Sequence, residues 1–585
     1  MDRRELLGLG VSMGALASTR RLAAEGARGT QSAQPPPQAA TTTAAANAYS
    51  RCFEPLDRYV AQYMSAMNIP GMTLGLADAN GVQLVRDYGV EDLELGRPLS
   101  AGRLFQIGSI SKSFVAVCLM QLRDEGRFDP HRPISEYFPW VRYDGFDRPI
   151  TSHDLMTHAA ALPDGPTFPA DPALRYRSTA PAGSFFHYCN MGWAVMGFLV
   201  EKLDGRPLAL SLRERVFKPL GMDASEGAIN LDNVSRIAMS YQPERNDRPL
   251  PRSGALVQGA PIVYTEGAGC IASTAHDMAR YVQMIVNRGA AGGKRLMSPE
   301  GFALFTHRHI AADEFGEGAS YGYGLATDML DGHVRLSHTG GMVSFSSALQ
   351  VDVDAGVGAF ASINAMQGGR PSDVVEHALR LMRACKENAP LPKFPPDSSP
   401  LEIEDAADYA GTYAAGDGHT LQVIADGDRL YLEHRDERVP MEAFDDSDNA
   451  FIVLHEDFAL YPLVFARGGS HGKGPVIEVG WGERWYAGSA YQGARDFPVP
   501  AEWSRYTGHY RSEDPWIGSI RIVARRGRLW FNGITPLEPA SNGRYYLRDE
   551  PTSPEWVSFT EIVNGGAMLL CYSGYVLQRV EGPRA

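Results

Sequence analysis

The sequence predicts a mixed α/β (α+β) domain, in which one antiparallel sheet is covered by helices, followed by two all-β, barrel-like domains. Two observations support this organisation. Apolar hairpins stand at both ends of a long segment, residues 50–390, with helical sequence between them. Two later segments, 403–497 and 498–585, share short motifs and alternate apolar with polar residues, which is the period of half-buried strands.

Composition narrows the class of protein. The 585 residues are enough for several domains. A formal net charge of −14 argues against a nucleic-acid partner, because phosphate contacts need clustered lysine and arginine. With 44% hydrophobic and 21% charged residues the chain is globular rather than disordered. Since no apolar run reaches 18 residues, we expect no transmembrane segment.

Residues 1–25 have the pattern of an export signal, with a charged start, a short apolar run and Ala15-Leu16-Ala17. The Arg3-Arg4 pair resembles a twin-arginine signal, which predicts an exported, periplasmic protein. The alternative is an amphipathic helix that the mature protein keeps, but three glycines in this stretch would weaken such a helix. Residues 26–49, rich in Gln, Pro, Thr and Ala, are predicted to be a disordered tether.

Residues 50–390 contain the elements of the predicted sheet. A helix is expected from Leu56 to Met67, before Pro70, and another from Asp373 to Lys386. Two hairpins are expected, the first with a turn-rich tetrapeptide between its strands and the second with an Ala-Gly turn. Their strands are Met72–Ala77 with Val82–Val90, and Ala348–Val353 with Val357–Ile363. Because both ends of the segment supply strands and a helix, we expect them to join in one antiparallel sheet.

Two β segments follow a proline-rich linker, residues 391–402. The motif Tyr409-Ala-Gly411-Thr-Tyr413 recurs in the second segment as Tyr506-Thr-Gly508-His-Tyr510. Such repetition indicates a duplicated unit. Closed barrels are the expected form, because closure removes exposed strand edges.

The strongest chemical motif is Ser109-Ile-Ser-Lys112, at the start of a predicted helix. Residues three apart on a helix are neighbours. Burial can lower the pKa of such a lysine toward neutrality, so that it takes the proton of the serine. The helix N-terminus favours the negative charge that develops. On its own, however, a Ser-x-x-Lys pattern is weak evidence.

Two further motifs follow in order, Tyr188-Cys-Asn190 and His338-Thr339-Gly340-Gly341. Together the three motifs resemble the active site of the serine β-lactamase and penicillin-binding-protein superfamily. More narrowly they resemble its branch of class C β-lactamases, D-Ala-D-Ala carboxypeptidases and D-aminopeptidases. One such domain followed by two β domains is similar in architecture to D-aminopeptidases. Taken singly, Tyr188 could be a packed core tyrosine and His338 a histidine at a strand edge.

The resemblance implies a role for each matching residue. Ser109 would be the acylated nucleophile and Lys112 its base. Tyr188 would pass a proton to the leaving group and help activate the deacylating water. Asn190 would bind the substrate amide oxygen or orient Lys112. Backbone N–H groups of Ser109 and Gly341 would form the oxyanion hole.

The resemblance also implies that His338, Thr339 and Gly340 line a sheet edge on which the substrate lies as an added strand. His338 stands where most β-lactamases have lysine, and a histidine at this position resembles peptidases and aminopeptidases. We expect it to titrate near neutrality, whereas a lysine would stay charged.

No cofactor or metal is expected. The six cysteines are scattered, without metal-binding spacing or a dense disulfide framework. We therefore expect that folding needs no disulfide. His307-Arg-His309 has no acidic or cysteine partner nearby in the sequence, which favours a solvated face over a metal site.

The sequence thus predicts an exported serine hydrolase that works through an acyl-enzyme on a small peptide, amide or ester. D-amino-acid amides or peptides, or peptidoglycan stem peptides, are the favoured substrates, with an esterase or β-lactamase as the alternative. A different class is a non-catalytic binder of cell-wall fragments. An acidic loop, residues 445–448, is expected to be a solvated turn; the alternative is that a β-domain loop reaches the Ser109 cleft. The oligomeric state stays open.

Overall fold

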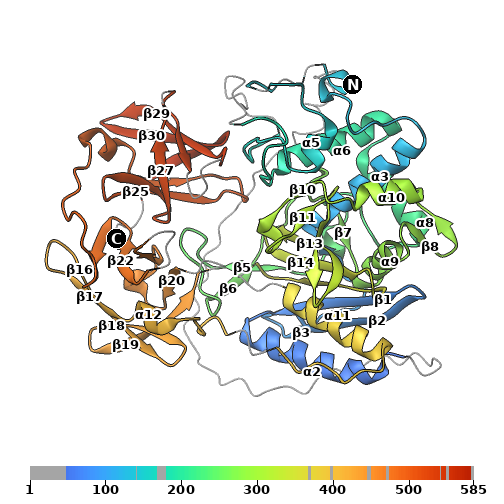
Figure 1. Ribbon diagram of the computed structural model, residues 1–585, viewed down its shortest axis with the longest axis horizontal. Helices are drawn as coiled ribbons and strands as arrows, with labels where there is room; N and C mark the ends of the chain where they lie inside the picture. The colour runs from blue at the N-terminus through green and yellow to red at the C-terminus, as the bar shows by residue number, and fades with distance from the viewer. Residues whose placement is uncertain are drawn as a thin grey trace.

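The computed structural model describes residues 48–139, 141, 143–145, 147–167, 180–366, 371–395, 399–444, 449–469, 474–540, 542–547 and 553–581. The predicted export signal, nearly all of the predicted tether and the acidic loop 445–448 lie outside these residues. A part built of helices, one nine-stranded sheet and three two-stranded sheets stands beside two β-barrels (Figure 1). None of the helices in the described part of the chain combines the length and apolar character needed to span a membrane.

The predicted antiparallel sheet is confirmed. It has nine strands in the order β10-β11-β12-β13-β14-β15-β1-β2-β3. The two ends of the segment meet where β1 pairs antiparallel with both β2 and β15. The strands are β1 (Gly71–Asp78), β2 (Gly81–Asp92), β3 (Arg97–Pro98), β10 (Ile310–Ala311), β11 (Ser320–Tyr321), β12 (Ala326–Leu330), β13 (His333–Met342), β14 (Phe345–Asp352) and β15 (Val357–Ile363).

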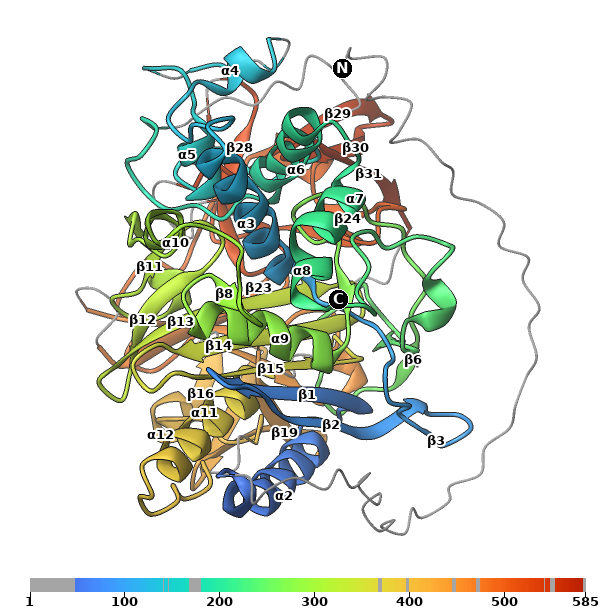
Figure 2. The same cartoon turned by 90° about the vertical axis from the view of Figure 1, so that its right-hand side faces the viewer.

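Helices cover both faces of the sheet (Figure 2). On one face α2 (Ser50–Ala66) and α11 (Ser372–Lys386) bury apolar side chains against β1, β14 and β15. On the other face α9 (Ala275–Val286) lies so close that a Cβ on Gly75 would stand 2.3 Å from the carbonyl oxygen of Ala275. Behind it lie α3 (Ser111–Asp124) and α6 (Asn190–Asp204), in the largest apolar core.

A disulfide joins Cys52 of α2 to Cys385 of α11, across 333 residues of sequence. The scattered cysteines gave no reason to expect this pairing. It arises because the first and last helices of the segment pack side by side, which no spacing rule could indicate. The other four cysteines are buried thiols.

The two predicted barrels are confirmed as closed eight-stranded barrels. The first comprises β16 (Gly411–Ala414), β17 (Thr420–Asp426), β18 (Arg429–His434), β19 (Glu437–Ala443), β20 (Ala450–Val453), β21 (Leu463–Arg467), β22 (Val476–Trp481) and β23 (Arg484–Ala487). The second comprises β24 (Gly508–Arg511), β25 (Ser519–Arg525), β26 (Arg528–Phe531), β27 (Thr535–Pro539), β28 (Tyr545–Leu547), β29 (Trp556–Val563), β30 (Gly566–Tyr572) and β31 (Tyr575–Val580).

The repeated tyrosine motif has the same structure in both barrels. The hydroxyl of Tyr413 donates to the carbonyl oxygen of Tyr409, and that of Tyr510 donates to the carbonyl oxygen of Tyr506, each at 2.8 Å. Both tyrosine rings are buried in the barrel cores. The motif therefore fastens the first strand of each barrel to the turn before it.

Both barrels dock on one loop of the larger part, the connection between β5 (Tyr241–Pro243) and β6 (Leu256–Gln258). Arg245 pairs with Glu456 of the first barrel at 2.9 Å. Asp247 pairs with Arg521 of the second barrel, also at 2.9 Å. The loop thus lies between the sheet and the barrels (Figure 1).

Candidate active site

Ser109 lies in a short 3-10 helix, η1 (Gly108–Ile110), directly before α3. Gly108 has φ +54°, a conformation that favours glycine. A Cβ there would also stand 2.7 Å from the carbonyl oxygen of Gly341 on β13. This close approach places the Ser109 hydroxyl at the end of the sheet, where the side chain stays partly exposed.

Lys112, three residues later, is fully buried. Its Nζ lies 2.8 Å from Ser109 Oγ, 2.7 Å from Asn190 Oδ1 and 2.9 Å from the carbonyl oxygen of Ala268. The last two atoms can only accept a hydrogen bond. A neutral amine would donate its two N–H groups to them and keep its lone pair for the Ser109 hydroxyl.

The protonation of Lys112 is set mainly by burial. Removal from water lowers its pKa from 10.5 to about 7, and the negative charge of Asp164 opposes this shift. A substantial fraction of Lys112 is therefore neutral at physiological pH and able to accept a proton.

Tyr188 stands beside this pair, just before α6. Its ring packs against His158 at 4.2 Å between centroids, and Lys112 Nζ lies 4.9 Å from the centroid of the Tyr188 ring. Burial raises the pKa of Tyr188 above its ordinary value, although hydrogen bonding with Ser109 lowers it in part. The phenol is therefore protonated at neutral pH and is within reach of Ser109.

Asn190 begins α6 and is held by a residue that the sequence analysis did not single out. Asp164 accepts from the backbone N–H of Asn190 at 2.7 Å and from its Nδ2 at 2.8 Å. Asp164 directly follows Leu162-Pro163, but nothing in that pattern indicated a contact with Asn190. Burial raises the pKa of Asp164, and the charge of Glu555 raises it further.

Thr339, Gly340 and Gly341 lie on a stretch of β13 that extends beyond its neighbour β12. The ladder between β12 and β13 ends at Ser337, so that residues 338–342 pair only with β14 among the described strands. Thr339 and Gly341 are exposed there. With both barrels and the 246–252 loop, residues 339–341 line a cleft of about 630 Å³.

His338 differs from the expectation that it titrates near neutrality. Its side chain is buried, and Nε2 lies 2.8 Å from the hydroxyl of Tyr321. Burial and the positive charge of Lys112 lower the pKa of His338 to about 3. It is therefore neutral at physiological pH and faces the aromatic cluster behind the site, including Tyr188.

The second barrel also contributes to the site. Glu555, directly before β29, is only 8% exposed. Its Oε1 accepts from the backbone N–H of Asp164 at 2.7 Å and lies 2.9 Å from Nε2 of His187. These contacts bring a barrel residue next to Asp164, which holds Asn190, and next to His187, which precedes Tyr188, although no local sequence signal identified Glu555.

The surroundings of Ser109 carry several carboxylates. The charge of Asp164 acts on Lys112, and Glu314 adds to the raised pKa of Tyr188. Glu266 lies two residues before Ala268, and burial raises its pKa. Asp164 is thus the carboxyl group whose charge acts on Lys112, while Glu314 acts on Tyr188.

Other clusters lie apart from Ser109. Among the described residues, one group could hold a metal ion: His434, His455 and Asp457 on the first barrel. There Asp457 already pairs with His434 and Arg435.

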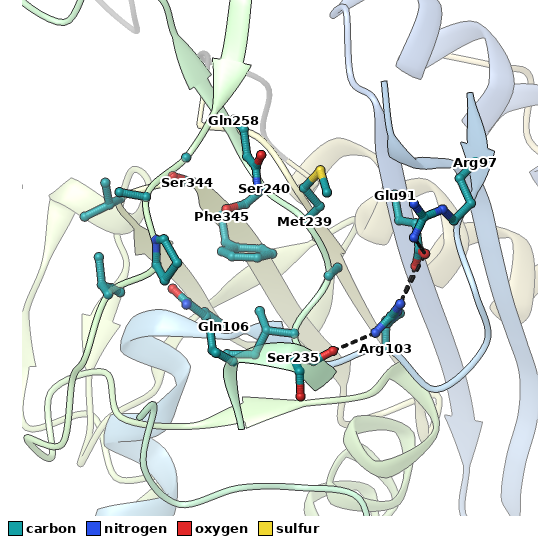
Figure 3. Close-up of a pocket in the computed structure, with 18 residues that line it drawn as sticks. Glu91, Arg97, Arg103, Gln106, Ser235, Met239, Ser240, Gln258, Ser344 and Phe345 are labelled. Carbon is teal, nitrogen blue, oxygen red and sulfur yellow. Dashed lines mark hydrogen bonds and ion pairs between the residues drawn. The ribbon is translucent and has the colours of Figure 1, made fainter. Parts of the chain in front are cut away.

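A smaller cavity of about 230 Å³ contains the Glu91–Arg103 ion pair and the ring of Phe345 (Figure 3). None of the predicted site residues lines this cavity.

The fold, with a serine and a lysine in contact at the end of its sheet, is typical of serine hydrolases of the β-lactamase type. The sequence model of the Beta-lactamase family matches residues 56–382, and the chain belongs to that family. It is 26% identical over 369 residues to "Penicillin-binding protein 4" of Amycolatopsis lactamdurans, which covers 59% of this chain and 93% of the relative. It is 28% identical over 314 residues to "Esterase EstB" of Burkholderia gladioli, and that alignment covers 46% of this chain and 78% of the relative.

A solved structure supports the fold. The octameric penicillin-binding protein homologue from Pyrococcus abyssi superposes with a TM-score of 0.54 at 21% identity. The alignment covers 74% of this chain and 99% of that one.

Proposed function

We propose that this serine hydrolase cleaves D-amino-acid amides or short peptides with a free amino group, through an acyl-enzyme on Ser109. The observation that carries the mechanism is the short contact between Ser109 Oγ and Lys112 Nζ, with two other acceptors on the same nitrogen. Ser109 Oγ attacks the substrate carbonyl carbon, and its proton passes to Lys112.

The later steps use the residues around this pair. Backbone N–H groups of Ser109 and Gly341 hold the negative oxygen of the tetrahedral intermediate, each worth about 10²–10³ in rate. Tyr188 donates a proton to the leaving amine, and Lys112 restores the tyrosine proton. Water then attacks the acyl-enzyme, and its proton passes through Tyr188 to Lys112. The bond between the acyl carbon and Ser109 Oγ breaks, Lys112 returns the proton to Oγ, and the free acid is released. The substrate lies along Thr339 and Gly340, beside the exposed stretch of β13.

The acidic surroundings support a substrate with a free ammonium group. A substrate carboxylate would be repelled by the charge of exposed Glu314, whose field reaches Tyr188, whereas an ammonium would be attracted by it. A close, partly desolvated pair contributes about 1–3 kcal/mol, and an exposed pair less than about 1 kcal/mol. These magnitudes favour an aminopeptidase-like activity over one that requires a substrate carboxylate.

We expect the enzyme to prefer D-alanine p-nitroanilide over its N-acetyl derivative by at least about tenfold in kcat/KM, from one pair of 1.4 kcal/mol. Glu314→Gln should reduce this ratio, whereas Glu376→Gln, on α11 where it pairs with Arg335, should not. Steady-state kinetics with both substrates, a short-chain ester and nitrocefin measures the preference. Faster turnover of the N-acetylated substrate or of nitrocefin would contradict the proposed substrate class.

The alternative is an esterase, favoured by the similarity to an esterase of Burkholderia gladioli. An ester leaving group needs less protonation than an amine, so the same centre could hydrolyse it without a strong demand on Tyr188. Comparing Tyr188→Phe on the amide and on the ester separates the two: an esterase would keep most of its ester turnover.

The rate of Ser109 acylation should rise with pH through a midpoint near 7. Below the Lys112 pKa of about 7 the amine is protonated and cannot accept the serine proton; above it the neutral form dominates. The measurement is the labelling rate of Ser109 by a fluorophosphonate between pH 5 and 9, within the range where the fold is intact. A flat profile would exclude Lys112 as the titrating base.

We also propose export, as the N-terminal sequence predicts. The Cys52–Cys385 disulfide supports this location, because disulfides form and persist in oxidising compartments such as the periplasm.

A further inference from the structure

A continuous series of hydrogen bonds leads from the second barrel to Lys112. It begins at Glu555, whose Oε1 accepts from the backbone N–H of Asp164 at 2.7 Å and lies 2.9 Å from His187 Nε2. The other oxygen, Oε2, accepts from the hydroxyl of Ser573 at 2.5 Å. Both oxygens are therefore engaged, and the barrel fixes the position of the carboxylate.

The next link fixes the orientation of an amide. The Asp164 carboxylate accepts from the backbone N–H and the Nδ2 of Asn190. Since the backbone N–H of Asn190 donates to one Asp164 oxygen and Nδ2 donates to the other, the Asn190 NH₂ group points toward Asp164. The amide oxygen then faces Lys112 Nζ at 2.7 Å. A flipped amide would present N–H groups to the lysine instead.

Orientation matters because the direction of the Lys112 lone pair depends on it. Asn190 Oδ1 and the Ala268 carbonyl take up two N–H groups of the amine. The remaining position faces Ser109 Oγ at 2.8 Å. If Asn190 turned, one N–H would lose its acceptor and could turn toward Ser109, where a lone pair is needed.

We infer that Glu555 is a positioning residue of the hydrolase: it holds Asp164 from the second barrel and, through Asp164 and Asn190, keeps Lys112 aimed at Ser109. The inference rests on the proposed role of Lys112 as the base. On this view the second barrel completes the catalytic centre, rather than only narrowing its entrance.

The charge of Glu555 also matters at its second partner. Burial alone would lower the pKa of His187, but the hydrogen bond and charge of Glu555 outweigh burial and raise it. The His187–Glu555 ion pair therefore fastens the barrel to the chain just before Tyr188. The groups that face it are Asp164 and Glu314.

The test compares two substitutions in the full chain. Glu555→Ala removes the acceptor for the Asp164 N–H, whereas Glu555→Gln keeps a carbonyl oxygen at that place without the charge. We expect Glu555→Ala to lower kcat and the rate of Ser109 labelling by 10- to 100-fold, with KM changed less than threefold. Glu555→Gln should keep at least a third of the wild-type rate.

Glu456→Ala is the matched control, since it removes an ion pair between a barrel and the same large segment without any link to Lys112. It should leave kcat unchanged. If Glu555→Ala shows no thermal unfolding transition and is therefore not folded, Ser573→Ala takes its place in the test. Loss of this one hydrogen-bond donor to Glu555 should lower kcat three- to tenfold.

Wild-type labelling and kcat in Glu555→Ala, or in a folded Ser573→Ala where that replaces it, would overturn the inference. Equal losses of kcat in Glu555→Ala and Glu555→Gln would overturn it as well. They would show that the hydrogen-bond acceptor for the Asp164 N–H does not determine the rate. The Ser109→Ala variant distinguishes failure of the inference about Glu555 from failure of the proposed function. Labelling that survives Ser109→Ala would refute the mechanism itself, whatever Glu555 does.

Discussion

Replacing Lys112 with methionine should lower kcat/KM by at least about a thousandfold, because residues that act as one catalytic unit fail together. Methionine has a similar length and fills the buried slot without accepting a proton. It leaves Asn190 Oδ1 and the Ala268 carbonyl without their donor, at about 1–3 kcal/mol each when buried. Because methionine carries no amine, the variant also avoids the free-energy cost of burying one, and we expect it to fold.

A second measurement on the same variant tests the buried lysine directly. The folded-state pKa of Lys112, about 7, lies below its ordinary value of 10.5. Between these values the unfolded chain binds more protons than the folded one, so the contribution of Lys112 makes stability rise with pH in this window. Lys112→Met should remove that contribution. The comparison is the difference in unfolding free energy between wild type and variant at pH 7 and pH 9.

If turnover of Lys112→Met stays within tenfold of wild type, Lys112 is not the base. If the difference in unfolding free energy is the same at both pH values, the lysine does not titrate in this range. Ser109→Ala serves as the control for labelling and should abolish it, since no other described residue is proposed as the nucleophile.

Gly340→Ala should inactivate and destabilise the protein. A Cβ at this position would stand 1.9 Å from the carbonyl oxygen of Ile107, which is backbone and cannot turn aside. The strand and η1 would have to separate, and this would displace the Ser109 N–H from the oxyanion. Overpacking in a tight core costs about 1–3 kcal/mol or more. We expect a lower unfolding midpoint and at least a hundredfold loss of labelling rate.

Gly341→Ala is the matched control for stability. On the same strand, its Cβ would approach only the flexible end of Met366, at 3.4 Å. The unfolding midpoint of Gly341→Ala should stay close to wild type, while that of Gly340→Ala falls. Equal stabilities would show that the contact between η1 and β13 can relax.

Periodicity predicted much of the fold, because the signals are local. The hairpins of 72–90 and 348–363 and the helix of 373–386 are each encoded by apolar spacing and turn residues. The structure places them as β1–β2, β14–β15 and α11. The repeated tyrosine motif likewise predicted two similar barrels, because each copy fastens a strand to its own preceding turn.

Long-range contacts are what the sequence could not supply. Cys52 and Cys385 carry no spacing signal, since they meet only after the sheet has closed. Glu555 is one of many glutamates, and its place beside Asp164 depends on how the second barrel docks. The lowered pKa of His338 likewise depends on contacts that form only in the folded protein. From the sequence alone a histidine has its ordinary pKa, and only the packing around it lowers that value.

The contact between Glu555 and Asp164 has a consequence for the order of events during synthesis. The two residues are 391 positions apart. At about 5–20 residues per second, a ribosome adds the second roughly 20–80 s after the first. Likewise, β1 cannot pair with β15 until the ribosome has made β15. A nascent chain would therefore carry Ser109 and Lys112 well before the barrel that holds them in place, and full hydrolytic activity would begin only once the second barrel has been made and has docked.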